Sequence, residues 1–314
     1  MSRTTGAIRI LPYSRVVGQN DLKLALELNY VAPRIGGVLM AGARGTAKST
    51  IVRAFALMAH AELPVTLPIN ATDDRVVGGW ELEALMRGEA RPQAGLLEEA
   101  AGKGLLYIDE VNLLDDHLVN VILDVVSTGV LSVQREGLAN AKHVSFGLVG
   151  TMNPEEGWLR PQLLDRFGLM VVAQQQDTET RHRTIKTVLA FEEEYQKEES
   201  PWLQEAERDN TATRDLLELA RSRVATMKVP DEMIQLCAQV AQRVEAVGQR
   251  GEIVATLAAR ALAALEGAET VEPGHLLRVL PMAFRHRRPE TAHGGTFDWT
   301  TDDEARVMDL FETG

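Results

Sequence analysis

The residues best suited to chemistry form a glycine-rich segment that ends in a lysine and two hydroxyl side chains. They are Gly42, Ala43, Arg44, Gly45, Thr46, Ala47, Lys48, Ser49 and Thr50. Apolar residues 37–41 precede the segment, and residues 51–58 continue it with the apolar spacing of a helix. Consecutive backbone N–H groups in such a turn surround phosphate oxygens, the lysine reaches the β and γ phosphates, and the first hydroxyl ligates Mg²⁺. The pattern therefore predicts a phosphate-binding loop for ATP and Mg²⁺.

The loop departs from the usual pattern at Ala47, where a glycine normally precedes the lysine. If the backbone there requires positive φ, a Cβ atom costs roughly 1–2 kcal/mol. If the position is only close to phosphate, a methyl group fits without that cost. A glycine-rich turn that binds nothing is the plain alternative, and the other motifs of the chain argue against it.

Two acidic residues follow a second apolar run, residues 104–108. Such a run is typical of a buried parallel strand, and ligands bind at the carboxyl ends of these strands. We expect Asp109 to hold Mg²⁺ through water and Glu110 to polarise the attacking water. Asn153, at the end of another strand-like run, could orient that water with its amide. Acidic residues and an Asn-Pro pair can also simply form turns.

Arg166 is the best candidate for an arginine finger, which is a guanidinium that stabilises the γ-phosphate of a neighbouring subunit. Arg160 is the alternative finger, and a salt bridge within the chain is the structural alternative for Arg166. A finger implies that active sites form between subunits.

The elements that must position these residues are an α/β core and a helical domain. We expect strands at 37–41, 64–69, 104–108 and 169–173 and a hairpin of 130–135 with 142–149. Apolar residues recur at helical spacing over 213–227, 231–247, 253–266 and 273–285. The predicted domains are a nucleotide-binding core at 1–190, a linker at 191–210, a helical lid at 211–290 and a tail at 291–314.

Composition narrows the class of protein. The chain has 314 residues and a formal net charge of −12, so a general electrostatic affinity for nucleic acid is disfavoured. The only cysteine, Cys237, lies in an apolar helical pattern and is expected to be a buried thiol. No apolar run reaches the ~18 residues of a membrane-spanning helix, and the first residues do not resemble a signal peptide. We expect a soluble, cytoplasmic protein with no membrane contact.

Four stretches together resemble the AAA+ ATPase subunit (I-type) of magnesium chelatases, over roughly residues 13–290. They are residues 42–50, 106–114, 153–157 and 159–168. The resemblance implies an AAA+ P-loop NTPase with a parallel-sheet core and an all-helical lid, carrying a helix-2 insert at 71–95 and a hairpin before sensor 1 at 130–149. It also implies a hexameric or similar ring that uses ATP to drive metal insertion, with Mg²⁺ as the expected metal, into a porphyrin or corrin. Its partners would be a D-type subunit, with a degenerate AAA+ domain and a von Willebrand factor A-like domain, and a large catalytic H-type subunit.

The resemblance also assigns residues. Val17 and Gly18 would contact the adenine base, although a turn before the first helix explains them equally well. Asn153 would be sensor 1, and Arg250 would be sensor 2, touching the γ-phosphate in cis, unless it simply faces solvent at a helix start. The basic stretch 286–289 resembles the ending of the family and would contact other subunits. Apart from the resemblance, the amphipathic end at 304–311 could dock on a neighbour.

Three other functions compete with the chelatase ATPase. A MoxR-type AAA+ activator would work with a von Willebrand A-domain protein to mature another enzyme, but the stretch at 159–168 favours the chelatase branch. A nucleotide-binding structural subunit that no longer hydrolyses ATP would explain Ala47, but it has no need for Glu110 or Arg166. A helicase is disfavoured by the negative charge.

Overall fold

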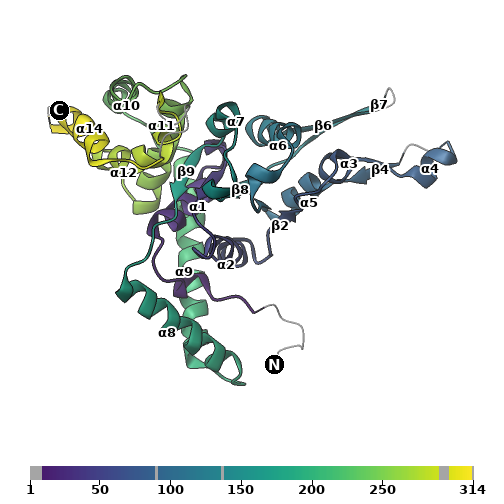
Figure 1. The fold of residues 1–314 in the computed structure, drawn as a ribbon, viewed down its shortest axis with the longest axis horizontal. Helices are drawn as coiled ribbons and strands as arrows, with labels where there is room; N and C mark the ends of the chain where they lie inside the picture. Colours follow the sequence, from purple (N-terminus) through teal and green to yellow (C-terminus); the bar gives the residue numbers. More distant parts are fainter. Residues whose placement is uncertain (1–8, 89–90, 136–137, 290–296, 313–314) are drawn as a thin grey trace.

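The computed structural model describes residues 9–88, 91–135, 138–289 and 297–312. A sheet of five parallel strands lies at its centre, in the order β2, β5, β8, β1, β9 (Figure 1). The strands are β1 (Val38–Ala41), β2 (Val65–Leu67), β5 (Leu105–Ile108), β8 (Gly147–Met152) and β9 (Leu169–Val172). All residues of β1 and β5 are buried, as expected for parallel strands covered on both faces. The predicted α/β class with a parallel sheet is confirmed.

Helices cover both faces of the sheet. One face carries α1 (Asn20–Val31) and α2 (Lys48–His60), and the other carries α5 (Leu96–Lys103), α6 (Asp116–Thr128) and α7 (Pro161–Arg166). Successive side chains of a strand point to opposite faces. Val38 and Met40 accordingly join the apolar cluster of α1 and α2, whereas Leu39 and Ala41 join that of α5 and α6.

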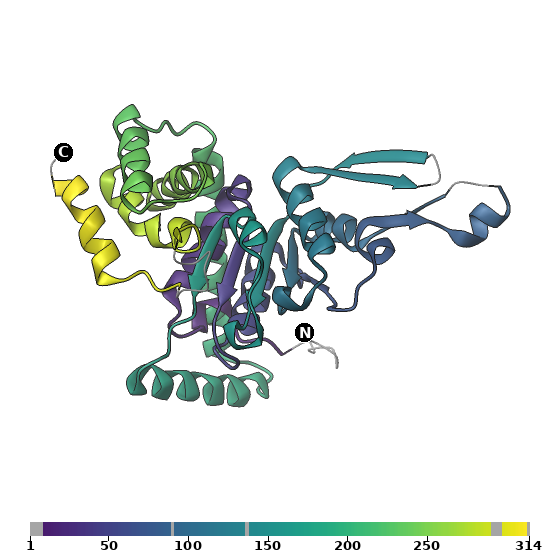
Figure 2. The same ribbon diagram turned by 45° about the horizontal axis from the view of Figure 1, so that its top comes forward.

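Two projections leave the same side of the core, as Figure 2 shows. The first contains α3 (Asp73–Val77), β3 (Gly78–Trp80), α4 (Leu82–Met86) and β4 (Pro92–Ala94), and the second is the hairpin of β6 (Val130–Arg135) with β7 (Leu138–His143). The predicted return strand, 142–149, was wrong, because the hairpin returns over Leu138–His143. Residues 147–152 instead form the central strand β8, where their apolar side chains are buried between β5 and β1.

The remaining chain is helical. Its helices are α8 (Thr178–Tyr195), α9 (Pro201–Val224), α10 (Asp231–Arg243), α11 (Arg250–Glu266), α12 (Pro273–Phe284) and α14 (Thr301–Glu312). The earlier part of the chain also contains the short 3-10 turns η1 (Tyr13–Arg15), η2 (Pro33–Ile35), η3 (Val111–Leu113) and η4 (Pro154–Glu156). The smaller helical domain is therefore confirmed. Most of the predicted linker, 191–210, is helical in the structure. Helix α8 continues to Tyr195, and α9 begins at Pro201, capped by Ser200. No helix in the described ranges has both the length and the apolarity to cross a membrane.

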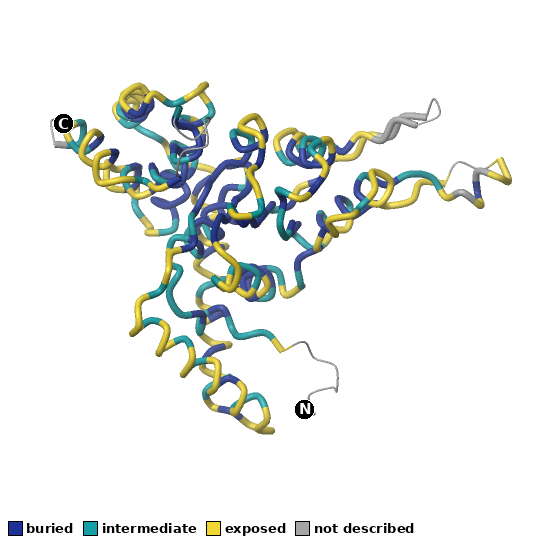
Figure 3. Tube along the Cα trace, in the orientation of Figure 1, coloured by how far each residue is buried: buried dark blue, intermediate teal, exposed yellow. Residues whose placement is uncertain are grey.

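The C-terminal segment packs on the lid of its own chain, and the docking of 304–311 on a neighbour stays a prediction. Val307 of α14 is fully buried, and the Arg243 guanidinium donates to the carbonyl of Arg306 at 3.2 Å. Residues 286–288 are also buried rather than a surface patch. In Figure 3 the buried positions gather in the sheet and in α11 and α12 of the lid, while most of α8 is exposed.

Candidate functional site

The carboxyl ends of three neighbouring strands bring most of the predicted site residues together. β1 leads into the glycine-rich loop, β5 into Asp109 and Glu110, and β8 into Asn153. A cavity of about 400 Å³ lies at this edge. Its lining comprises residues 44–50, Asp109, Glu110, Thr151, Met152 and Asn153. The local motifs of the sequence thus form one site because β5, β8 and β1 are adjacent in the sheet.

The lysine of the loop donates hydrogen bonds to the backbone of the same loop. The Lys48 ammonium donates to the carbonyl oxygens of Gly42 at 2.7 Å and Ala43 at 2.8 Å. Burial lowers the pKa of Lys48, while the charges of Asp109 and Glu110 act in the opposite direction. A Cβ atom at Gly42 would lie 2.8 Å from the Cβ of Ala173, so this turn has no room for a side chain. The result is a narrow backbone cradle with one ammonium group in it, and both features suit a phosphate.

Ala47 adopts the conformation that a glycine usually supplies, with φ 64° and ψ 13°. Of the two alternatives that the sequence left open, the structure therefore selects the strained one. Ala61, just past the other end of α2, has φ 56° and is also left-handed. A Cβ atom in this region costs about 1–2 kcal/mol.

Replacing Ala47 by glycine should stabilise the fold. The relief of backbone strain, about 1–2 kcal/mol, exceeds the entropy cost of about 0.4–1 kcal/mol that glycine adds through the unfolded chain. We expect Ala47→Gly and Ala61→Gly each to raise the free energy of unfolding by about 0.5–1 kcal/mol in urea titrations. Ala212→Gly, in the exposed middle of α9, should instead destabilise by about 1 kcal/mol. Destabilisation by Ala47→Gly would contradict the strained conformation.

A buried tyrosine joins the two residues that were predicted to bind the metal ion. The Tyr107 hydroxyl lies 2.8 Å from Ser49 Oγ and 2.8 Å from Asp109 Oδ1. Thr151 Oγ1 donates to the same carboxylate oxygen at 2.7 Å and accepts from the backbone N–H of Glu110 at 3.1 Å. Burial raises the pKa of Tyr107 to about 12, so its hydroxyl stays protonated at neutral pH.

Our reading of the sequence missed both Tyr107 and Thr151. The available signal was a hydroxyl-bearing side chain in each of two otherwise apolar strand runs that end at the site. A single hydroxyl on an apolar strand has no local reason to be buried unless it has a hydrogen-bond partner.

Glu110 is held in an unusual conformation. Its φ of 57° is left-handed, a region that non-glycine residues rarely adopt and that is enriched at functional sites. Arg44 lies 3.5 Å from the Glu110 carboxylate and also forms an ion pair with Glu156. The Arg44 side chain is 74% exposed, so this ion pair can separate at little energetic cost.

Asn153 caps a turn, as an Asn-Pro pair often does, and it also lines the cavity. Its side-chain oxygen accepts from the backbone N–H of Glu155 at 3.3 Å, which caps η4. The residue is 5% exposed and lines the cavity. The cap uses one lone pair of the amide oxygen, so the amide keeps its NH₂ donors and one lone pair for hydrogen bonding in the cavity.

The two predicted arginines lie together, away from the cavity lining. Arg166 donates to Asp124 at 2.8 Å, which is the intrachain salt bridge considered as its alternative. Arg250 donates to the backbone carbonyl of Arg166 at 2.7 Å. Arg250 does not line the cavity, because α11 begins beside η2 and the end of α7. Its expected contact with the γ-phosphate in cis stays a prediction. The alternative finger, Arg160, pairs with Asp116 at 2.6 Å.

Val17 and Gly18 form a turn outside the cavity at the glycine-rich loop. Gln176 donates to the carbonyl of Val17 at 3.3 Å, and Gly18 has φ 70°. Gly18 lines a separate cavity of about 460 Å³ together with the lid residue Arg278. The turn that the sequence predicted is present, and a contact with a nucleotide base stays a prediction.

Comparison with known proteins identifies related sequences. The chain matches the family of AAA domains (dynein-related subfamily) over residues 37–167 and the AAA lid domain over residues 234–306. It is 41% identical over 312 residues to the magnesium-chelatase 38 kDa subunit of Rhodobacter capsulatus, with 88% of each chain covered. It is 42% identical over 310 residues to the corresponding subunit of Cereibacter sphaeroides, covering 88% of this chain and 91% of that one. Among solved structures it is similar to a chain in the complex between the BchI and BchD subunits of magnesium chelatase. That chain is 38% identical, with a TM-score of 0.51 and coverage of 91% of this chain and 99% of the other.

Proposed function

Because the chain belongs to the AAA ATPase (I-type) subunit family of magnesium chelatases, we propose that it hydrolyses ATP to drive metal insertion into a tetrapyrrole by a multisubunit chelatase. The observation that carries the proposal is the convergence of Lys48, Asp109 and Glu110 on one cavity. The names of the relatives favour this function over a MoxR-type activator. The metal of the relatives is magnesium, and Mg²⁺ is accordingly the proposed substrate ion.

The residues at the cavity fit ATP with Mg²⁺. The cradle at Gly42 admits no Cβ atom, and the N–H groups at the start of α2 together with Lys48 would hold the phosphates. Ser49 and Asp109 supply the oxygen ligands that Mg²⁺ prefers. When bound, Mg²⁺ neutralises charge on the phosphate oxygens.

Glu110 and Asn153 act on the attacking water in this proposal. Glu110 accepts a proton from the water, and Asn153, which lines the cavity, orients the water with its amide. Before it can do so, Glu110 must leave its ion pair with the exposed Arg44.

Arg166 acts in trans in this proposal. It ends α7 and does not line the cavity of its own chain. A ring of identical chains, hexameric or similar, would place Arg166 at the γ-phosphate of the next subunit, where a guanidinium group stabilises transition-state charge. Arg250, the proposed sensor 2 at the start of α11, would contact the γ-phosphate in cis.

The proposed partners are a D-type subunit and a large H-type subunit. Support for the first comes from the related structure, which is a complex of BchI with BchD. The test is a pull-down with the Glu110→Gln protein, loaded with ATP and Mg²⁺, followed by mass spectrometry of the recovered proteins. Lys48→Ala, which loses the phosphate-binding ammonium, is the matched control.

Recovery of a very large subunit together with a von Willebrand A-domain subunit, from Glu110→Gln but not from Lys48→Ala, is the expected result. Recovery of the A-domain protein with an unrelated enzyme would replace the chelatase function by the activator function.

Removing the Tyr107 hydroxyl should weaken Mg²⁺ binding. Tyr107→Phe keeps the ring packing but deletes the hydroxyl between Ser49 and Asp109. A hydrogen bond to a charged group contributes about 1.5–3 kcal/mol, so we expect the Mg²⁺ concentration for half-maximal ATPase activity to rise about tenfold. Tyr13→Phe, which removes a comparable buried bond to Glu27, should leave it unchanged. Equal Mg²⁺ dependence of the Tyr107→Phe and Tyr13→Phe proteins would rule out this role.

A further inference from the structure

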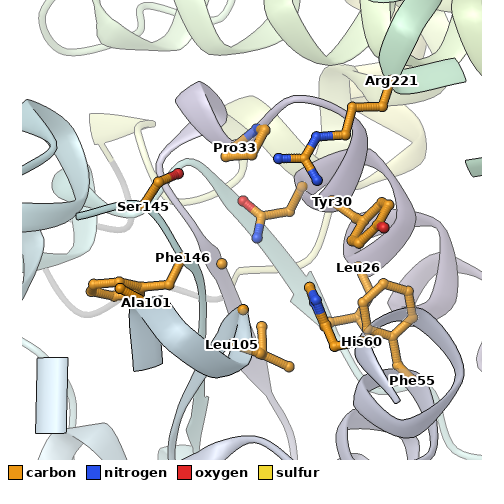
Figure 4. A pocket seen from close by; sticks show the side chains of 13 residues that line it. Leu26, Tyr30, Pro33, Phe55, His60, Ala101, Leu105, Ser145, Phe146 and Arg221 are labelled. Atoms are coloured by element: carbon orange, nitrogen blue, oxygen red, sulfur yellow. The ribbon is translucent and has the colours of Figure 1, made fainter. Parts of the chain in front are cut away.

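A second cavity lies at the opposite, amino-terminal end of the sheet. It has a volume of about 210 Å³ and lies where β5 and β8 begin, lined by residues of α1, α2, α5 and α9 (Figure 4). Helix α2 begins at Lys48 in the phosphate-binding loop and ends at His60 in this cavity. With 13 residues, the helix separates the two sites by about 18 Å. The second cavity is therefore distinct from the ATP site.

One wall of the cavity is aromatic. The Tyr30 ring packs edge-on against His60, with ring centroids 5.2 Å apart, and against Phe55 at 6.2 Å. His60 rests directly on Gly104, where a Cβ atom would lie 2.2 Å from its Nδ1. Burial, then the nearby Arg221, lowers the pKa of His60, so the imidazole is neutral at neutral pH. This wall suits a flat ring.

The polar groups at the cavity are mainly hydrogen-bond donors. Figure 4 shows Arg221 and Ser145 reaching toward the cavity from different sides. The Arg221 guanidinium lies over the Tyr30 ring, 5.4 Å from its centroid. Asn29 is buried, and its side-chain oxygen accepts from the backbone N–H of Gly37 at 3.2 Å. Its NH₂ nitrogen lies beside Gly147 of the lining, where a Cβ atom would be 3.3 Å from it, and its two N–H donors are suited to a ligand oxygen.

The charges around the cavity act in both directions. The Glu218 carboxylate accepts a hydrogen bond from the Tyr30 hydroxyl and does not line the cavity. Helices α1, α2 and α5 end here, and the partial negative charge of a helix C-terminus opposes an anion. Among the lining residues Arg221 carries a full positive charge. Its charge-assisted hydrogen bonds are stronger than the effect of those partial charges, which favours an anionic ligand.

We propose that this cavity binds a small aromatic acid, a single planar ring that bears a carboxylate. The ring packs against Tyr30 and His60, and the carboxylate accepts from Arg221, Asn29 and Ser145. A cavity of about 150 Å³ holds benzene, so 210 Å³ accommodates one ring with its carboxylate and excludes a tetrapyrrole.

The test is calorimetric titration of benzoate into the full chain saturated with ADP and Mg²⁺, which fills the ATP site. We expect one saturable site with a Kd of about 1 mM or tighter, and binding of benzyl alcohol at least about tenfold weaker. Arg221→Gln should weaken benzoate binding by at least about tenfold. Arg223→Gln, the same change on the same helix but beside Gly267, should leave it unchanged.

A second variant tests the cavity independently, in case Arg221→Gln does not fold. Ser145→Leu fills the cavity from an exposed position and should abolish saturation. Absence of saturable benzoate binding to the wild-type chain, equal loss in Arg221→Gln and Arg223→Gln, or full binding to Ser145→Leu would overturn the proposal.

A different observation carries a second inference, which rests on the proposed function. The Arg287 side chain is completely buried, and its Nε donates to Asp165 Oδ1 at 2.9 Å. Its terminal nitrogens donate to the backbone carbonyls of Asp165 at 2.7 Å, Phe167 at 2.6 Å and Gly168 at 3.0 Å. Burial lowers the pKa of Arg287 to about 10, so the guanidinium remains charged at neutral pH.

Two more lid side chains hold the same segment. Arg250 donates to the carbonyl of Arg166, and His286 Nε2 lies 3.2 Å from that of Phe167. The backbone on both sides of Arg166 is thus fixed to the lid, while the Arg166 side chain is 34% exposed. We infer that Arg287 is a positioning residue for Arg166, so that the orientation of the lid determines where the arginine finger lies.

The test mixes two variants in one ring. Arg287→Lys keeps the charge but loses the planar fork, and Glu110→Gln has an inactive site with an intact Arg166. We expect Arg287→Lys alone to lose at least about tenfold in ATPase activity with unchanged ATP affinity. Adding excess Glu110→Gln should restore activity per Arg287→Lys subunit, because its sites then receive intact fingers.

The control mixes Arg166→Ala with Glu110→Gln, and its failure to recover would contradict the proposed ring rather than the role of Arg287. Full activity of Arg287→Lys alone, or no recovery where the control recovers, would overturn the inference. If Arg287→Lys does not fold, Asp165→Asn removes the carboxylate partner at a position whose side chain is 44% exposed.

Discussion

Glu110→Gln should lower ATP turnover by roughly 10²–10⁴-fold while ATP binding is retained. The carboxylate is the proton acceptor for the attacking water in the proposed mechanism, and an amide of the same shape cannot accept that proton. The phosphate-binding groups, Lys48 and the start of α2, are untouched by the change. Turnover is measured as phosphate release at saturating ATP, and binding by equilibrium dialysis.

Glu156→Gln is the matched control for this experiment. Glu156 shares Arg44 with Glu110 but does not line the cavity, so its loss should change turnover by no more than a few fold. Unchanged turnover in Glu110→Gln would remove Glu110 from the mechanism. Loss of ATP binding in that variant would instead indicate a structural role.

Arg166→Ala should abolish most ATP hydrolysis through the neighbouring subunit. An arginine finger contributes about 10³–10⁵-fold to turnover, and in a ring each Arg166→Ala subunit inactivates a site that belongs to another chain. Mixing the variant into wild-type protein should therefore depress total activity more steeply than dilution of wild-type subunits predicts. The measurement is ATPase activity across a series of mixing ratios.

Asp124→Ala separates the finger role from the salt bridge within the chain. It removes the carboxylate partner of Arg166 but leaves the guanidinium in place. The Asp124 side chain is 61% exposed, so the pair contributes at most about 1 kcal/mol to stability. We expect Asp124→Ala to remain active in mixed rings. A strictly proportional fall with Arg166→Ala would exclude a finger in trans.

Several parts of this protein follow from the sequence alone. The glycine-rich loop before Lys48 and the acids after the apolar run of β5 are local patterns. Each combines a strand-length apolar stretch with turn residues that have a specific chemistry. Parallel strands place their carboxyl ends at one edge, so the common location of the loop, Asp109, Glu110 and Asn153 could also be predicted. The resemblance of 159–168 to one family narrowed the function further.

Other features depend on contacts between residues that are far apart in the sequence, and only the tertiary structure decided them. Residues 142–149 carry a strand pattern, but burial between β5 and β1 assigns 147–152 to the sheet and leaves the hairpin to Leu138–His143. The basic residues 286–288 suggested a surface patch, yet the buried Arg287 is stabilised by Asp165 and backbone carbonyls that lie over a hundred residues earlier.

Contacts between distant residues also decide the surroundings of Arg250 and Tyr107, which local sequence does not reveal. A helix-start arginine such as Arg250 has no local feature that tells whether its lid packs over the loop or beside α7, since that choice depends on how the whole lid is docked. Tyr107 likewise gains its role only when β5, β8 and α2 bring Asp109, Thr151 and Ser49 to one hydroxyl. Sequence therefore predicted which groups could do the chemistry, and the packing of distant elements decided which of them meet.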